Sequence, residues 1–139
     1  HNHGYVRTPI GRKRNLPGIA SFDKAIRAEA ERAAVNSPVQ SAASDLNLFA
    51  AIRVAQTFPE DVKIVATVHD AILMEVKEDR LNEILPQVKE IMEDREAVAE
   101  KFGWDIPVPL EVEIKVGPWG KGKIFASNND NLQNNSNVI

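Results

Sequence analysis

Two apolar, β-prone runs, 62–68 and 71–76, meet at a tight turn whose residues are His69 and Asp70. Two such runs with a two-residue connection predict an antiparallel β-hairpin. Hairpin turns normally favour residues that accept positive φ, such as Asn-Gly or Asp-Gly. A His-Asp pair instead exposes an imidazole and a carboxylate on a rigid edge, which indicates chemistry more than chain reversal.

Composition excludes several classes of site. The chain has 139 residues, no cysteine and three histidines, two of them at its N-terminal end. This length is sufficient for one domain with its own core. Disulfides and thiolate metal sites are excluded, and an imidazole-rich zinc site is not expected. No run reaches the ~18 apolar residues of a membrane span and no signal peptide is visible, so we expect a cytoplasmic protein without a membrane partner.

Charge is unevenly distributed along the chain. The formal net charge of −3 argues mildly against a dedicated nucleic-acid-binding module, which is usually basic. Basic side chains nevertheless cluster near the start, at Arg7, Arg12, Lys13 and Arg14, whereas acidic side chains gather in 79–100. The basic cluster could contact phosphates, although such clusters are also common on ordinary protein surfaces.

A long first helix is predicted between the basic cluster and the hairpin. Asp23 is suited to cap a helix that starts at Lys24 and continues to about Gln56 through an Ala-rich segment. Pro38 lies inside this segment and disfavours helical backbone at the preceding residue, so we expect a kink or a break there. Asp45, farther along the same segment, is expected to be structural.

The remaining patterns predict a second helix and further strand. Residues 79–101 have apolar side chains on one helical face, with Pro86 expected to bend the helix or shift its start. Residues 72–74 are consecutively apolar, which fits a strand buried on both faces. Residues 108–116 alternate as in a half-exposed strand, and the Asn-rich end has no periodicity and is expected to be disordered. The fold class is therefore α+β, an antiparallel sheet covered by two long helices.

A polar stripe occupies one face of the first predicted helix. Arg32, Asn36 and Gln40 are spaced four residues apart, so they fall on the same side of a helix. These side chains offer several donors and little packing value. Such a stripe can follow the minor groove of a duplex, where every base pair presents acceptors. A solvated helix face is an equally good interpretation when these residues are considered alone.

Three segments carry a resemblance to a known family. They are Gly-Tyr-Val-Arg-Thr-Pro-Ile-Gly-Arg-Lys-Arg-Asn-Leu-Pro-Gly-Ile at 4–19, the segment 30–45, and the hairpin segment. The most specific pieces are Ala-Glu-Arg-x-Ala-x-Asn-x-Pro-x-Gln at 30–40 and Val-His-Asp at 68–70, and the three segments follow one another in a fixed order and spacing. Together they resemble the C-terminal part of family A DNA polymerases, the bacterial DNA polymerase I type that many phages also use. The resemblance implies an end of the fingers with the basic loop in 1–30, the last part of a polymerase palm, with its palm-type antiparallel sheet, in 31–124, and a disordered Asn-rich tail in 125–139.

The resemblance also implies an activity, template-directed nucleotidyl transfer by a two-metal mechanism. Asp70 would be one of two catalytic aspartates and a ligand of Mg²⁺, which prefers carboxylate oxygens. His69 would help to hold the primer 3′ end. The partners would be a DNA primer-template, deoxynucleoside triphosphates and an upstream polymerase segment. The residues expected to contact DNA are Arg32, Asn36, Gln40, Arg12 and Arg14.

Some parts of a family A active site are missing from this sequence. It has neither the earlier palm aspartate nor the fingers helix that grips the incoming nucleotide, so we expect a partial enzyme that is inactive by itself. Ala71 stands where the family usually has an acidic residue, which removes one negative charge beside the metal site. The alternative is a non-catalytic module that binds primer-template duplex or assists assembly. Ala71 and the Asn-rich tail favour a phage or other viral source.

Overall fold

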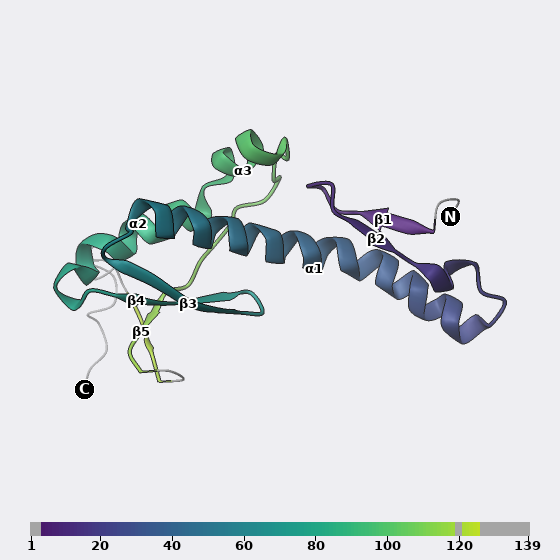
Figure 1. Ribbon diagram of the computed structural model, residues 1–139, viewed down its shortest axis with the longest axis horizontal. Helices are drawn as coiled ribbons and strands as arrows, with labels where there is room; N and C mark the ends of the chain where they lie inside the picture. Colours follow the sequence, from purple (N-terminus) through teal and green to yellow (C-terminus); the bar gives the residue numbers. More distant parts are fainter. Residues whose placement is uncertain (1–3, 119–120, 126–139) are drawn as a thin grey trace, which may run out of the picture.

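The computed structural model describes residues 4–118 and 121–125, and it combines helices with short antiparallel sheets (Figure 1). Among these residues the strands form three separate two-stranded sheets, β1–β2, β3–β4 and β5–β6. This confirms the predicted α+β class. The elements are β1 (Tyr5–Arg7), β2 (Lys13–Asn15), the 3₁₀ helix η1 (Pro17–Ala20), α1 (Lys24–Thr57), β3 (Val62–Val68), β4 (Ala71–Val76), the 3₁₀ helix η2 (Glu78–Arg80), α2 (Leu81–Glu93), α3 (Arg95–Phe102), β5 (Lys115–Val116) and β6 (Lys123–Ile124).

Helix α1 has 34 residues, and the other elements pack along its two halves (Figure 1). The Asp23 carboxylate accepts the backbone N–H groups of Ala25 at 2.8 Å and Ile26 at 3.4 Å, so the predicted cap and start are confirmed. The helix continues through Pro38 without interruption. The break that the sequence allowed is therefore absent, although proline removes one hydrogen bond from the helix.

The β1–β2 hairpin and η1 lie along the N-terminal half of α1 (Figure 1). Leu16, between β2 and η1, is buried, as is Ala30 on the helix. Gly18 in η1 approaches α1 so closely that a Cβ atom there would lie 2.9 Å from Cγ2 of Ile26. Glycine at this position therefore allows η1 to pack directly on the first turns of the helix.

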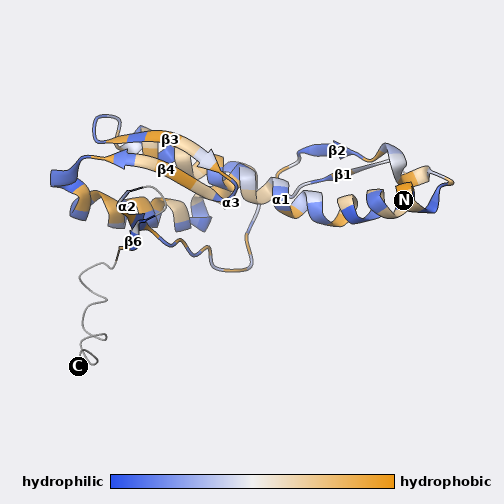
Figure 2. Cartoon of the chain, turned by 90° about the horizontal axis from the view of Figure 1, so that it is seen from below, coloured by the Kyte–Doolittle hydropathy of each residue, from blue (hydrophilic) through white to orange (hydrophobic). Residues whose placement is uncertain are grey.

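The main hydrophobic core lies between the C-terminal half of α1, the β3–β4 hairpin and α2. One face of the hairpin packs on this core, and both strands are largely apolar (Figure 2). The hairpin packs through one face against α1 and α2, which agrees with the predicted antiparallel sheet covered by helices, although α2 has only 13 residues against 34 in α1. The buried core residues are Val54, Phe58, Val62, Ile84 and Val88, and the partly buried residues around them are Ile64, Met74, Val76, Ile91 and Met92.

Strand β4 is less buried than its sequence predicted. Ile72, Leu73 and Met74 are all half-buried instead of buried on both faces. Because the described part of the chain forms a sheet of only two strands here, the apolar residues of β4 are covered mainly on the side of α1 and α2. An apolar run reports a preference for burial and does not by itself supply a second covering layer.

The second helical stretch is divided into two helices, which corrects the prediction of one helix over 79–101. Helix α2 ends at Glu93 and α3 begins at Arg95. Between them, Asp94 accepts the backbone N–H of Ala97 at 3.0 Å and a hydrogen bond from Arg53 of α1 at 2.7 Å. A side chain that caps a new helix competes with continuation of the old one. Pro86 lies within α2 without ending it.

The strand predicted over 108–116 is also wrong in extent. Only Lys115–Val116 forms a strand, which pairs with β6. Side chains from Leu110 to Val116 still alternate between half-buried and exposed, as the sequence pattern indicated. In the described chain the preceding residues have no neighbouring strand; the Ile114 carbonyl accepts the N–H of Phe125 at 2.8 Å, and the N–H of Val112 donates to Glu93. Residues 119–120 and, apart from Phe125, the predicted disordered tail 125–139 lie outside the described residues.

Candidate functional site

The His69–Asp70 loop lies at the free end of the β3–β4 hairpin, with strand bounds equal to those predicted. Val68 pairs with Ala71, so the loop contains two residues. His69 has φ 55° and is the single non-glycine residue with positive φ in the described chain. Positive φ at the first loop position matches the twist of the strands in a hairpin turn. Both side chains are exposed at the tip, where they can reach a ligand outside the chain.

The other end of the hairpin is held by an ion-pair network. Asp61 accepts from Lys77 Nζ at 2.9 Å and pairs with Arg80, and Arg80 Nη2 lies 2.7 Å from Glu83 Oε1. The hydrogen bond from Lys77, together with the positive charge of Arg80, lowers the pKa of Asp61 below its usual value despite some desolvation. The same hydrogen bond raises the pKa of Lys77. With the core, this network fixes the direction in which the tip projects.

Asp70 offers one metal ligand and no complete metal site. Among residues 4–118 and 121–125, no three histidine or acidic side chains are grouped closely enough to hold a metal ion. One carboxylate on a rigid turn fits a site for Mg²⁺, which takes one or two carboxylates with phosphate and water oxygens.

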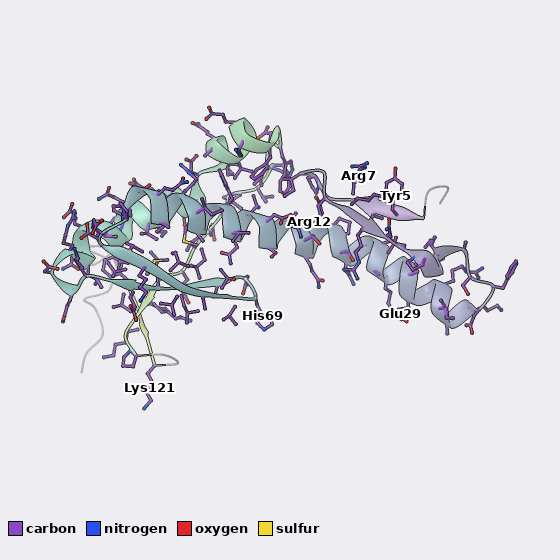
Figure 3. All side chains as sticks on the ribbon, in the orientation of Figure 1. Tyr5, Arg7, Arg12, Glu29, His69 and Lys121 are labelled. Carbon is purple, nitrogen blue, oxygen red and sulfur yellow. The ribbon has the colours of Figure 1, made fainter. Side chains whose placement is uncertain are left out.

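The polar stripe faces the same side of α1 as the hairpin tip. Glu29 and His69 both lie below the helix in Figure 3, whereas Arg7 lies above it. Steps of three, four and four residues from Glu29 reach Arg32, Asn36 and Gln40, so all four occupy one face of the helix. The three stripe residues are exposed.

Two exposed valines accompany the stripe and were not identified from the sequence. Val35 and Val39 are 71% and 70% exposed, and their spacing places them beside Arg32 and Asn36 on the helix. Their spacing of four residues was the only feature of the sequence that could have placed them on one helix face. The polar stripe is therefore bordered by two apolar side chains, and no described part of the chain covers this surface of α1.

The basic cluster lies on the other side of α1 and is partly engaged in internal contacts (Figure 3). Arg12 pairs with Asp45 of α1, which agrees with a structural role for that aspartate. Arg7 Nη1 donates to the carbonyl of Gly11 at 3.2 Å. Lys13 Nζ lies 4.1 Å from the ring centroid of Tyr5. The structure thus brings Arg32, Asn36 and Gln40 to the side of the tip, but does not bring Arg7 and Arg12 there.

Similarity to known proteins covers most of the chain. Residues 1–121 match the model of DNA polymerase family A. The thermostable DNA polymerase I of Thermus filiformis is 40% identical over 115 residues, which make up 82% of this chain and 13% of that protein. The DNA polymerase of Bacillus phage SP01 is 40% identical over 114 residues, 78% of this chain and 12% of that protein.

A solved structure is similar as well. It is the POL domain of Pol1 from M. smegmatis in complex with DNA primer-template and dNTP, with a TM-score of 0.66 and 36% identity over 78% of this chain and 18% of that one. The fold is thus similar to part of a polymerase domain. The chain belongs to DNA polymerase family A, which confirms the family predicted from the three segments. It spans 12–13% of the length of the two curated relatives.

No helix in residues 4–118 or 121–125 is long and apolar enough to cross a membrane.

Proposed function

We propose that this chain forms the part of a DNA-directed DNA polymerase that supplies one catalytic aspartate and a contact surface for the primer-template. The observation that carries the proposal is the common side of α1 on which the His69–Asp70 tip and the polar stripe lie (Figure 3). A duplex that follows the stripe then has its end close to the tip. The similar M. smegmatis domain, in complex with primer-template and dNTP, supports these partners.

Asp70 is the proposed metal ligand. Its carboxylate would hold one oxygen position of Mg²⁺, and the remaining ligands would come from phosphates, water and an aspartate of an upstream polymerase segment. When bound, the metal neutralises phosphate charge and activates the attacking 3′ hydroxyl. The imidazole of His69 is exposed at the same tip, and its proposed role is to help hold the primer 3′ end by a hydrogen bond.

The stripe is the proposed minor-groove contact. Arg32, Asn36 and Gln40 present donors along one line, and the minor groove presents an acceptor at every base pair. Contacts of this kind hold correctly paired duplex without selecting a sequence, as a polymerase requires. Arg12 and Arg14 were also expected to bind DNA. Because the basic cluster lies across α1 from the stripe, only a different part of the nucleic acid could reach it, through phosphate contacts.

A non-catalytic duplex-binding module is the second candidate. The observation that favours it is Ala71, which places a methyl group next to Asp70 where the family usually has an acid. With one carboxylate at the tip, metal binding would depend wholly on oxygens from other molecules. Such a module would keep the stripe and lack nucleotidyl transfer.

Magnesium-dependent primer extension separates the two candidates. The chain is mixed with an upstream fingers-and-palm segment of a family A polymerase, and extension and primer-template binding are measured. We expect Asp70→Ala to abolish extension and to leave the dissociation constant for DNA largely unchanged. The matched control is Glu90→Ala, which removes an exposed carboxylate from α2. Extension by Asp70→Ala at the unmutated rate would make the catalytic assignment wrong, and DNA binding without any extension would favour the binding module.

Gln40→Ala tests the stripe. Loss of one hydrogen bond of about 1 kcal/mol should weaken primer-template binding about fivefold. Gln56→Ala is the control, because Gln56 is exposed at the end of α1 and lies on another face of the helix. Equal affinity and extension for Gln40→Ala and the unmutated chain would reduce the stripe to a solvated face.

A further inference from the structure

We propose that the Arg12–Asp45 ion pair keeps the two parts of α1 aligned across Pro38, and thereby positions the polar stripe relative to the His69–Asp70 tip. Arg12 and Asp45 are positioning residues in this view, and the pair is called the Pro38 brace below. The proposed effect on the alignment of α1 is inferred from the structure and does not depend on the proposed function. Its consequence for DNA synthesis rests on the proposed function.

Pro38 is the weak point of α1. Proline has no backbone N–H, so the carbonyl four residues earlier, at Ala34, loses its helical partner, and the proline ring crowds that carbonyl. Kinks in long helices are found mostly at such positions. Helix α1 nevertheless runs uninterrupted from Lys24 to Thr57. Contacts from outside the helix are therefore expected to hold it.

The β1–β2 unit contacts α1 on both sides of Pro38. Before the proline, Gly18 of η1 packs against Ile26 and Ala30. After it, Arg12 from the β1–β2 turn pairs with Asp45, about two helical turns beyond Pro38. One compact unit thus spans the position where the helix is weakest.

Asp45 is the more enclosed end of the brace. The Asp45 side chain is 11% exposed, and its second carboxylate oxygen is buried without a hydrogen-bond partner in the described chain. Arg12 is therefore the group that compensates this charge. The Arg12 side chain is 62% exposed, so the pair adds little stability by itself. Its effect is to fix where the β1–β2 turn sits on α1.

The Arg12 end is fixed by its own turn. The backbone N–H of Arg12 donates to Thr8 Oγ1 at 3.0 Å, its carbonyl accepts the N–H of Thr8 at 2.9 Å, and Gly11 N–H donates to the Thr8 carbonyl at 2.9 Å. Thr8 itself is buried. Because the turn is rigid, movement of Asp45 relative to the first turns of α1 is resisted by the whole β1–β2 unit.

The two parts of α1 carry different parts of the proposed site. Arg32 and Asn36 lie before Pro38, whereas the core that holds the β3–β4 hairpin is attached after it, through Val54. Bending at Pro38 would change the distance and direction from the stripe to the tip. A duplex held by the stripe would then present its primer end away from Asp70.

Distances between two spin labels, measured by pulsed electron paramagnetic resonance, test the Pro38 brace without DNA. The chain has no cysteine, so labels can be attached at Glu29→Cys and Gln56→Cys, exposed positions whose Cα atoms are about 40 Å apart along a straight helix. We expect one narrow distance distribution for the unmutated chain. Arg12→Gln and Asp45→Asn should each broaden it toward shorter distances. Pro38→Ala in either background should restore the narrow distribution.

Controls and folding are measured on the same samples. Arg14→Gln removes a neighbouring positive charge that is exposed, and it should leave the distance distribution unchanged. Far-UV circular dichroism verifies that each variant is folded, and Asp45→Asn, which keeps the shape of the side chain without a buried charge, is the milder change. An unchanged distribution in a folded Asp45→Asn chain would overturn the proposal, as would broadening that Pro38→Ala fails to correct.

Primer extension in the reconstituted polymerase separates positioning from a phosphate contact. The brace predicts that Arg12→Gln and Asp45→Asn both lower kcat/KM for primer-template, on the order of tenfold, and that the double variant is no worse than Arg12→Gln alone. If Arg12 instead bound a phosphate, Arg12→Gln would lower the salt dependence of binding by about one ion, and Asp45→Asn would tighten binding.

The second pattern would overturn the functional part of the proposal. If the unmutated reconstituted protein neither binds nor extends DNA, the proposed function fails, whereas the distance measurement still decides whether the brace exists.

Discussion

Replacement of His69 by glycine should stabilise the chain and at the same time impair DNA synthesis. His69 has φ 55°, a left-handed conformation that costs a residue with a side chain about 1–2 kcal/mol and glycine very little. Glycine loses more backbone entropy on folding, which costs about 0.5–1 kcal/mol. The imidazole is exposed at the tip, so its removal takes no packing from the core. The free energy of unfolding should therefore rise by about 0.5–1 kcal/mol.

Urea unfolding of the 139-residue chain, followed by far-UV circular dichroism, measures this change. The midpoint should increase and the slope with urea should stay the same, because the surface exposed on unfolding hardly changes. A rise of about 1 kcal/mol corresponds to a melting temperature about 3–5 °C higher for a chain of this size. In the reconstituted polymerase, the same variant should extend primers more slowly, because the proposed donor to the primer end is gone.

Asp70→Gly is the matched control for the backbone argument. Asp70 occupies the second position of the same turn and has no positive φ. Glycine there gains nothing from conformation and pays the entropy cost, so stability should fall by about 0.5–1 kcal/mol. Equal destabilisation by His69→Gly and Asp70→Gly would refute the strain argument. Unchanged extension by His69→Gly would refute the proposed role of the imidazole.

Two further predictions concern the parts of the fold that position the tip. The pKa of Asp61 is lowered chiefly by the hydrogen bond from Lys77. The ionised carboxylate therefore stabilises the folded chain at pH values above its usual pKa of 3.8, and this stabilisation is lost as the pH falls through the lowered pKa. Asp61→Asn should therefore flatten the fall of unfolding free energy below about pH 4 in urea titrations at several pH values. Gly18→Ala should destabilise the chain by about 1–3 kcal/mol, because the new Cβ would lie 2.9 Å from Ile26 Cγ2, and Ile26→Ala in that background should recover part of the loss.

The elements predicted well are those whose determinants lie within a few residues of one another. Asp23 caps α1 through backbone N–H groups two and three residues farther on, and the bounds of β3 and β4 follow from two apolar runs and a two-residue loop. The division at Asp94 was missed because its partner Arg53 is 41 residues away. A local pattern contains the cap but not the arginine that fixes its side chain.

In the segment 108–116, the alternating pattern predicted side-chain burial correctly but strand pairing incorrectly. Alternation predicts which side chains face the protein, and from Leu110 to Val116 it did so. It contains no information on whether a neighbouring strand is available, and within the described residues only Lys115–Val116 has one. Pairing depends on non-local topology, so the strand could not be delimited from its own residues.

The candidate site illustrates the same limit for charge. Four basic residues near the start of the chain were equivalent in sequence, but the fold gives three of them different partners: Arg12 binds Asp45, Arg7 binds the Gly11 carbonyl, and Lys13 lies over an aromatic ring. All four remain exposed, but only Arg12 has a carboxylate partner among the described residues, so charges that were equivalent in sequence differ in their surroundings. By contrast, the stripe was predictable because a helix fixes spacing, and only the path of α1 past the β3–β4 hairpin could reveal that stripe and tip share a side. Helical periodicity therefore identifies candidate contacts, while tertiary structure decides which of them can act on one ligand.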